Sequence, residues 1–407
     1  MNKKRLNFVI LLVFLFSVQF MYAQWQAAST GFPVDNMQSI TAIINSGNNL
    51  FASTAGLGVF MSTDDGANWS PVNNGLVISS VKCLALIGNR IFAGTSDSSI
   101  FISTNSGANW FVSGNGLDNA DVRTIFVNGN DIYLGSFGNG AYKSTDNGMN
   151  WMHIDSLDYG YFLSFAKVGN NLFAGTYNSS SGDIYISSDN GMNWILTNAS
   201  WADTTVLSLA GHGNNIYAGT DGGGILYSTN NGNNWTIINN GLRGLSVECI
   251  IFYGTYIIAG TEDGVYFSSN NGTNWYEISQ GLTDTYIHTL LIKGTTIYAG
   301  SNSGGIFKAN LSAFGIMAVN DLTDADNISM FPNPVNDKLF VSYSSGLASI
   351  YSIIIINNLG VPVIEKNNIP VSNNSVEINT SGLATGVYFC TIRSGNNTQT
   401  KKFVIIR

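Results

Sequence analysis

The stretch Ser62-Thr-Asp-Asp-Gly-Ala-Asn-Trp69 recurs in outline five more times, ending at Trp110, Trp151, Trp194, Trp235 and Trp275. The steps between successive copies are 41, 41, 43, 41 and 40 residues. Self-similarity at a fixed period of this size indicates a series of equivalent structural units stacked side by side. The octapeptide itself combines Ser, Asp or Asn with Gly, which is typical of a tight turn.

A second phrase, which in outline is an apolar residue followed by Ala-Gly-Thr, occurs seven times rather than six. Its copies lie around Phe51, Phe92, Tyr133, Phe173, Tyr217, Ile258 and Tyr298. The segment Trp25-Gln-Ala-Ala-Ser-Thr-Gly-Phe32 aligns with the segment that follows the first octapeptide, Trp69 to Leu76. The last repeat ends near Asn310, where its outer strand should begin. We therefore expect the N-terminal strand to complete the seventh unit, with Trp25 in the place of the missing tryptophan.

Each repeat contains four short strand patterns, which in the second unit are Val81–Ile87, Arg90–Thr95, Ile100–Thr104 and Asn109–Ser113. Small and bulky apolar residues alternate with a period of two in the first strand of every copy, which excludes a helical solenoid. Four strands in about 41 residues is the size of one blade of a β-propeller. The sequence predicts an all-β fold, with a seven-bladed β-propeller over residues 24–310 that the N-terminal strand closes.

The octapeptide resembles the Asp-box, or BNR repeat, of sialidase-like and sortilin-like propellers. The resemblance implies a structural role, in which side-chain oxygens accept backbone N–H bonds, Gly supplies a positive φ and Trp is buried in the blade. The residues assigned this role are Asp64, Gly66, Trp69, Asn105, Gly107, Trp110, Asp146, Gly148, Trp151, Asp189, Gly191, Trp194, Asn230, Gly232, Trp235, Asn270, Gly272 and Trp275.

The first 23 residues have the pattern of a secretory signal peptide. Three basic residues, Lys3 to Arg5, precede an apolar run from Leu6 to about Phe20, and Met21-Tyr22-Ala23 offers a cleavage site. The alternative is a membrane anchor, but about 15 apolar residues are short for a span. We expect no transmembrane anchor after cleavage.

The end of the chain departs from the repeat. Residues 311–327 are predicted to be a linker, and residues 328–407 a second domain with four strand phrases, near Met330–Leu339, Ile353–Gly360, Leu383–Phe389 and Lys401–Arg407.

As a set, these phrases resemble the C-terminal sorting domain of the type IX secretion system. The resemblance implies an Ig-like β-sandwich, a protein of the Bacteroidetes type, and the type IX machinery as a partner of residues 328–407. It also implies passage through the periplasm to the outer cell surface or the medium. The alternative is a carbohydrate-binding or adhesive β-sandwich. We expect the Ile353–Ile356 run to form a central strand.

Charge and motif content exclude several classes of function. Without the basic residues of the signal peptide the chain has 14 basic and 25 acidic residues, a net charge of −11 that argues against nucleic acid as a partner. The three histidines, His153, His212 and His288, have no zinc-binding spacing. A Ser nucleophile elbow and a Walker loop are also missing. We assign no metal, no cofactor and no catalytic residue.

The resemblance to the Asp-box raises two glycosidase hypotheses, a sialidase and a xyloglucanase-like glycoside hydrolase. A sialidase needs an arginine cluster, but the propeller has only Arg90, Arg123 and Arg243. A glycoside hydrolase resembling xyloglucanases needs two carboxylates about 5–10 Å apart. Asp121, Asp203, Glu248 and Asp284 lie at or near the starts of inner strands and could supply such a pair.

Two positions at the start of each inner strand vary from blade to blade. One set is Ser39, Ser80, Asp121, Tyr161, Thr205, Ser246 and Tyr286; the other is Thr41, Lys82, Arg123, Leu163, Leu207, Glu248 and His288. The candidate ligand-binding residues are Asp121, Arg123, Tyr161, Glu248, Tyr286 and His288, and the alternative is a solvated face without a ligand. The leading hypothesis is an exported, non-catalytic propeller that binds a glycan or protein partner, and the rival is the glycoside hydrolase.

Overall fold

The computed structural model describes residues 24–33, 39–97, 99–117, 120–158, 160–177, 182–197, 205–316, 328–343, 350–357, 361–369, 375–394 and 397–407. The predicted signal peptide and most of the predicted linker lie outside these ranges. The chain divides into two compact units between residues 317 and 318, and each is described by itself.

The first unit consists of seven four-stranded antiparallel sheets in its described residues. The first three blades are β2–β5 (Ile40–Ser46, Asn49–Thr54, Val59–Ser62, Ser70–Pro71), β6–β9 (Val81–Ile87, Arg90–Thr95, Ile100–Ser103, Phe111–Ser113) and β10–β13 (Val122–Asn128, Asp131–Ser136, Ala141–Ser144, Met152–His153). The next two are β14–β17 (Tyr161–Val168, Asn171–Tyr177, Ile184–Ser187, Ile195–Leu196) and β18–β21 (Val206–His212, Asn215–Thr220, Ile225–Ser228, Thr236–Ile237). The last two are β22–β25 (Val247–Tyr253, Tyr256–Thr261, Gly264–Ser268, Tyr276–Glu277) and β26–β28 (Ile287–Lys293, Thr296–Ser301, Ile306–Asn310) with β1 (Gln26–Ala27). A short 3-10 helix, η2 (Asp155–Leu157), follows β13.

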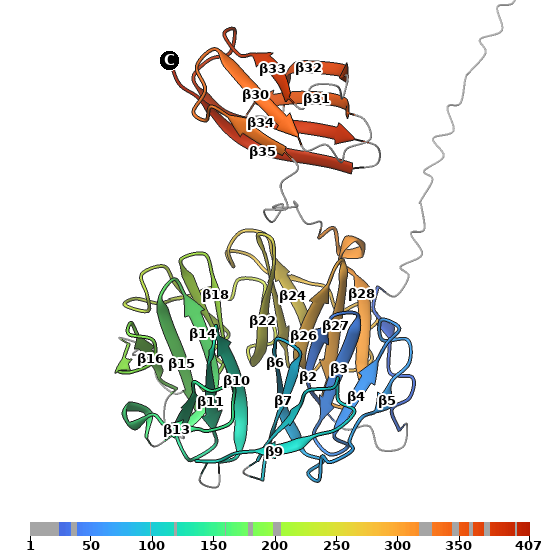
Figure 1. The fold of residues 1–407 in the computed structure, drawn as a ribbon, viewed down its shortest axis with the longest axis vertical. Coiled ribbons are helices and arrows are strands. Elements are labelled where there is room, and N and C mark those ends of the chain that lie inside the picture. Colours follow the sequence, from blue (N-terminus) through green and yellow to red (C-terminus); the bar gives the residue numbers. More distant parts are fainter. Residues whose placement is uncertain are drawn as a thin grey trace, which may run out of the picture. The chain divides into compact units, whose positions relative to one another are not determined.

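The sheets form a ring, because each innermost strand contacts the innermost strand of the next blade and β26 contacts β2 (Figure 1). Buried apolar side chains fill the layer between each pair of neighbouring sheets. The bulky residue of each inner strand, such as Ile43 or Leu84, lies in one of these layers. The seven-bladed β-propeller predicted from the repeats is therefore confirmed.

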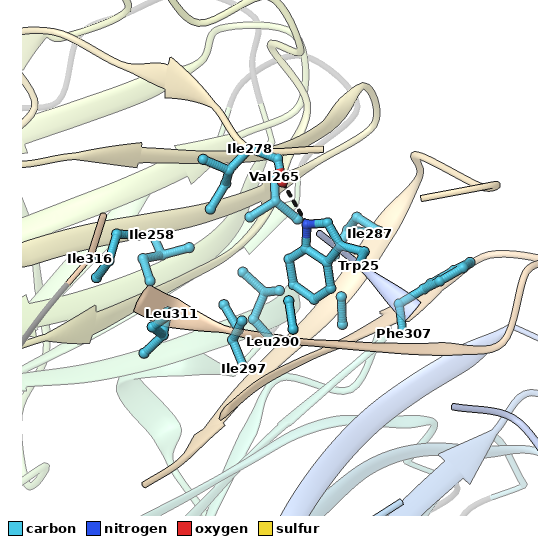
Figure 2. Close-up of a cluster of buried hydrophobic side chains, with 12 residues drawn as sticks. Trp25, Ile258, Val265, Ile278, Ile287, Leu290, Ile297, Phe307, Leu311 and Ile316 are labelled. Carbon is cyan, nitrogen blue, oxygen red and sulfur yellow. Dashed lines mark hydrogen bonds between the residues drawn. The ribbon is translucent and has the colours of Figure 1, made fainter. Parts of the chain in front are cut away.

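The N-terminal strand closes the ring as predicted. In β1, Gln26 pairs with Lys308 and Ala27 pairs with Phe307 of β28. The Trp25 side chain is 1% exposed, and its indole N–H donates to the carbonyl of Ile278 in the preceding blade at 2.5 Å (Figure 2). The first described strand thus belongs to the last blade.

The tryptophans lie between blades rather than inside one blade, which corrects the expectation for the octapeptide. The indole N–H of Trp69 donates to the carbonyl of Ala28, that of Trp110 to Val72, and that of Trp275 to Ile238, at 2.6–2.8 Å. Each acceptor follows the outer strand of the preceding blade. In these three copies the indole therefore joins neighbouring sheets, and Trp25 makes the same contact at the closure. The indole N–H of Trp194 instead donates to Gly191 within its own turn, at 3.2 Å.

A backbone contact accompanies each of these indoles. The N–H of Trp69 donates to the carbonyl of Thr30 at 2.8 Å, and the N–H of Trp110 donates to Asn74 at 2.8 Å. The next residue is glycine in both cases, Gly31 and Gly75, with φ of 103° and 84°. A Cβ on Gly31 would lie 2.0 Å from the carbonyl oxygen of Trp69, so only glycine allows this approach.

The packed unit extends past residue 310, where the linker was predicted to begin. A 3-10 helix, η3 (Leu311–Phe314), follows β28 directly. Leu311 and Ile316 are buried in the same cluster as Trp25 (Figure 2). The centre of the Phe314 ring lies 5.7 Å from that of the Trp25 ring. Residues 311–316 therefore cap the last blade.

The octapeptide forms one turn geometry in all six copies. In the first, Ser62 Oγ accepts from the N–H of Gly66 at 2.9 Å, and Asp64 Oδ1 accepts from the N–H of Asn68 at 2.8 Å. The fourth residue of every copy has a left-handed φ of 55–60°, as at Asp65. Copies with Asn in the third position keep the same bonds, as Asn105 does with Asn109 at 2.9 Å. The turn thus needs an acceptor oxygen in that position and does not need a charge.

The three aspartates in this position make the propeller sensitive to acid. Hydrogen bonds from Asn68 and Ser62 lower the pKa of Asp64 from 3.8 to about 2, and Asp146 and Asp189 are lowered to about 2 by equivalent bonds. Because the folded-state pKa is lowered, this stabilisation is fully present above about pH 4 and is lost as the pH falls towards 2. In urea unfolding at pH 7, 4 and 2.5, we expect the triple variant Asp64→Asn, Asp146→Asn, Asp189→Asn to lose less stability on acidification than the parent. Equal acid sensitivity of the two proteins would contradict this prediction.

The second unit is a sandwich of two antiparallel sheets. One contains β29 (Ile328–Phe331), β30 (Lys338–Tyr343) and β33 (Ser375–Asn379); the other contains β32 (Pro362–Ile369), β31 (Ile350–Asn357), β34 (Gly386–Ser394) and β35 (Asn397–Ile405). The predicted central position of the Ile353–Ile356 run is confirmed, because β31 pairs with β32 on one side and β34 on the other. Ile353 and Ile355 are fully buried between the sheets.

Candidate functional site

The variable positions lie on one face of the ring. Because the strands of each blade are antiparallel, the start of the inner strand lies at the same end as the finish of the second strand. The octapeptides, which follow the third strand, lie at the opposite end. We call the end that carries the inner-strand starts the entry face.

The structure adds a third variable position to this face, which sequence reasoning missed. It is the residue directly after the pair that ends the second repeated phrase, which is Gly-Thr or Gly-Ser in six blades and Ser53-Thr54 in the first: Ala55, Ser96, Phe137, Tyr177, Asp221, Glu262 and Asn302. The N–H of Phe137 donates to the carbonyl of Asp121 at 2.8 Å, and the N–H of Asn302 donates to Tyr286 at 2.9 Å. The third position is therefore adjacent to the first in each blade, and its change from Ala to Phe to Asp would have revealed it.

The first group of candidate residues, which we call the aromatic cluster, consists of Asp121, Arg123, Phe137, Tyr161 and Tyr177 from blades three and four. Arg123 Nη2 donates to Asp121 Oδ2 at 2.7 Å, and its guanidinium carbon lies 4.6 Å from the centre of the Phe137 ring. The Phe137 ring lies 4.2 Å from that of Tyr161 and 5.9 Å from that of Tyr177. The cluster therefore combines three aromatic rings with one neutralised ion pair.

The second group, which we call the carboxylate cluster, consists of Glu248, Asp284, Tyr286, His288 and Asn302 from blades six and seven. Tyr286 donates its hydroxyl to Glu248 Oε1 at 3.0 Å, and His288 Nδ1 lies 3.6 Å from Glu248 Oε2. His288 Nε2 lies 3.2 Å from Asn302 Oδ1.

Two pKa values in this group are shifted by their surroundings. Burial and the Glu248 carboxylate raise the pKa of Tyr286 to about 12. For His288 burial acts to lower the pKa, but hydrogen bonds with Glu248 and Asn302 outweigh it and the pKa is raised. The Glu248 carboxylate therefore favours the protonated forms of both side chains, and the Tyr286 hydroxyl donates to it directly.

The six predicted ligand-binding residues thus fall into two separate groups. Asp121, Arg123 and Tyr161 lie in the aromatic cluster, and the other three in the carboxylate cluster. Across the described ranges, no recorded hydrogen bond, ion pair or ring contact joins the two. The role of these residues in binding a ligand stays a prediction.

The carboxylates considered for a glycosidase pair are engaged by other groups. Asp284 Oδ2 accepts from the N–H of Ser303 at 2.6 Å and of Gly304 at 2.8 Å. Burial acts to raise the pKa of Asp284, but these backbone bonds outweigh it and lower the pKa. Such a group is a poor general acid, because a glycosidase acid needs a raised pKa. Asp203 lies outside the described residues.

One carboxyl that sequence reasoning missed has the opposite shift. Asp183 precedes β16 in the fourth blade, and burial raises its pKa. No spacing in the sequence identifies it, because its burial depends on the fold of the loop.

The described residues were compared with the requirements for a metal site and for a membrane-spanning helix. Among the described residues no group of three or more His, Cys, Asp or Glu side chains could hold a metal ion. No helix within these same ranges combines the length and apolar character needed to cross a bilayer.

The fold and the tail together define an exported β-propeller protein with a sorting domain. Residues 329–406 match the family model of the secretion system C-terminal sorting domain. This domain indicates export by the type IX system to the cell surface or the medium, as predicted. No curated protein matches the chain in sequence.

Solved structures resemble the chain in fold. PorZ, a surface component of the type IX system of Porphyromonas gingivalis, matches with a TM-score of 0.52 and 16% identity over 92% of this chain and 61% of PorZ. The GH74 xyloglucanase from Xanthomonas campestris matches with a TM-score of 0.57 and 12% identity over 93% of this chain and 67% of the enzyme. YCF48 from Cyanidioschyzon merolae matches with a TM-score of 0.55 and 14% identity over 71% of this chain and 99% of YCF48. The chain thus spans less than two thirds of PorZ, and identities this low show the fold alone.

Proposed function

We propose that this chain is an exported, non-catalytic binding protein whose propeller holds a glycan or protein partner on its entry face. The observation that carries the proposal is the contrast between the repeated framework and this face. The framework repeats nearly unchanged in every blade, whereas three positions per blade vary and gather into two clusters of functional side chains. Variation restricted to one face of a repeat protein is typical of a binding surface.

The chemistry of the face supports binding over catalysis. Of the carboxylates first considered, Asp121 is paired with Arg123, Glu248 is contacted by Tyr286 and His288, and Asp284 accepts backbone N–H bonds. Such groups are fixed in place by their hydrogen-bond and ion-pair partners, which suits recognition. The second candidate function is glycoside hydrolysis, favoured by one observation, the raised pKa of Asp183.

We also propose that residues 1–23 are a cleaved signal peptide and that the octapeptides are Asp-boxes with a structural role. The hydrogen-bonded turn seen in all six copies supports the second statement. In this proposal the octapeptides support the framework and take no part in ligand binding.

Binding and hydrolysis are separated by one experiment. The purified chain is incubated with plant and microbial polysaccharides, and reducing ends and retention of the protein are both measured. We expect retention by a polysaccharide or capture of a surface protein, without release of reducing ends. Release of reducing ends that Asp183→Asn abolishes would establish the hydrolase instead, and Asp263→Asn, at an equivalent loop of blade six, is the matched control.

A further inference from the structure

We propose that the aromatic cluster is a binding subsite for a neutral sugar residue of a glycan. This inference rests on the proposed binding function and names the ligand class for one of its two clusters. The exposure, the charge balance and the rigidity of the five side chains of the aromatic cluster support it.

The aromatic rings of the subsite are partly exposed on the entry face. Phe137 is 40% exposed, although it follows a strand whose other residues are almost all fully buried. Tyr161 and Tyr177 pair across β14 and β15, with ring centres 5.4 Å apart, and both are half-buried. A pyranose ring presents a face of C–H groups that packs on such an aromatic surface, and ligand sites are commonly lined in this way.

The polar part of the subsite suits hydroxyl groups. Arg123 retains several N–H donors beyond the one that contacts Asp121, and its side chain is 32% exposed. The Asp121 side chain is 24% exposed and uses Oδ2 for the ion pair, whereas its Oδ1 is buried and has no hydrogen-bond partner among the described residues. Sugar hydroxyls both donate and accept, so a paired guanidinium and carboxylate at the edge of an aromatic surface can contact adjacent hydroxyls of one ring.

Charge separates neutral from anionic sugars. The Arg123–Asp121 pair has no net charge, so the subsite itself supplies no unpaired cation for an acidic sugar, and the lysine among the variable positions of this face, Lys82, belongs to blade two. Across blades five to seven the same face carries Asp221, Glu248, Glu262 and Asp284. These carboxylates would repel an anionic polysaccharide that extended from the subsite, whereas a neutral chain avoids this cost.

The subsite is preformed. The backbone of Phe137 is fixed by its bond to the carbonyl of Asp121 and by a bridge to Tyr161. The N–H groups of Gly138 and Gly140 both donate to the carbonyl of Gly160 in the next blade, at 3.3 and 3.2 Å. Two blades therefore hold the rings before a ligand arrives, which reduces the entropy lost on binding.

The test uses the full purified chain in affinity electrophoresis and calorimetry. The neutral probes are mixed-linkage β-glucan, arabinoxylan, galactomannan and xyloglucan, and the anionic probe is polygalacturonate. We expect at least one neutral polysaccharide to bind and polygalacturonate to bind more weakly. Phe137→Ala should weaken binding about tenfold or more through loss of aromatic contact. Arg123→Lys, which keeps the charge and loses the planar fork, should also weaken it.

A matched control locates the effect. Tyr276→Ala removes an exposed aromatic ring from the outer strand of blade six, away from the entry-face clusters, and should not alter affinity for the neutral polysaccharide. Circular dichroism and thermal melting check folding, and Tyr177→Ala serves as a second variant if Phe137→Ala is unstable.

Three results would overturn the inference. They are no binding of any neutral probe, stronger binding of polygalacturonate, and binding that survives both Phe137→Ala and Arg123→Lys. Capture of a protein partner through the entry face in place of a sugar would leave the proposed binding function standing and remove only the glycan subsite. Hydrolysis of a probe would instead contradict the non-catalytic function.

Discussion

Deletion of residues 24–32 is expected to prevent the propeller from reaching its stable closed form. The deletion removes β1 from the last blade, the Trp25 indole from the layer between blades six and seven, and the Thr30 carbonyl that accepts from Trp69. It therefore affects both junctions of the seventh blade. The single variant Trp25→Ala should by itself cost about 3–5 kcal/mol, the usual range for a buried tryptophan.

The measurement is thermal unfolding followed by circular dichroism. For Trp25→Ala we expect the melting temperature to fall by roughly 6–20 °C, at about 2–4 °C per kcal/mol. Trp235→Ala is the matched control, because Trp235 has the same place in blade five but is only half-buried, so its loss should cost less. A melting temperature unchanged by the deletion would contradict closure by the N-terminal strand.

Substitution of Gly31 by alanine should have the second-largest effect. The new Cβ would lie 2.0 Å from the carbonyl oxygen of Trp69, and the residue would have to keep a φ of 103°. Either the backbone of the first blade moves or the hydrogen bond between Trp69 and Thr30 is lost. We expect a loss of more than about 2 kcal/mol, beyond the cost of a positive φ alone.

Gly47→Ala separates the two causes. Gly47 also has a positive φ, 59°, but nothing lies within 4 Å of a Cβ placed there. Its substitution should therefore show the conformational cost alone, about 1–2 kcal/mol. Equal loss of stability at the two positions, measured by urea unfolding, would show that the close approach to Trp69 is unimportant.

The architecture was predictable because the repeats supply the same evidence many times. All four strands expected in the second blade were located. The structure shortens only the third and fourth of them, to Ile100–Ser103 and Phe111–Ser113. Asn109 and Trp110 do not extend β9, because the N–H of Trp110 bonds to Asn74 of the neighbouring blade. The role of Trp25 followed from its alignment with Trp69, together with the seventh copy of the second phrase and the end of the last repeat near Asn310.

The contacts between blades could not be predicted in the same way. The period places residues within a blade but does not say which side of a sheet an indole faces, so the bond from Trp69 to Ala28 was missed. Leu311 and Ile316 lie in a stretch without a pattern, and their burial depends on the closed seventh blade.

Only the part of the candidate site that lies within the repeated pattern was predicted. Two of the three variable positions were found, because they lie within the recurrent inner strand. Phe137 follows the repeated phrase and was not counted as part of it, although it is the centre of the aromatic cluster. The division of the six candidates into two clusters depends on the distance around the ring, which the sequence does not express.

The bond between Ser29 and Ile306 joins residues that are 277 positions apart. A chain that emerges amino end first must therefore keep its earliest strand unpaired until almost the whole propeller has followed. Contacts over such separations form late in folding. If synthesis stops before β28, β1 has no partner and the truncated product keeps an open sheet edge. We expect such fragments to be cleaved by proteases more readily than the closed propeller.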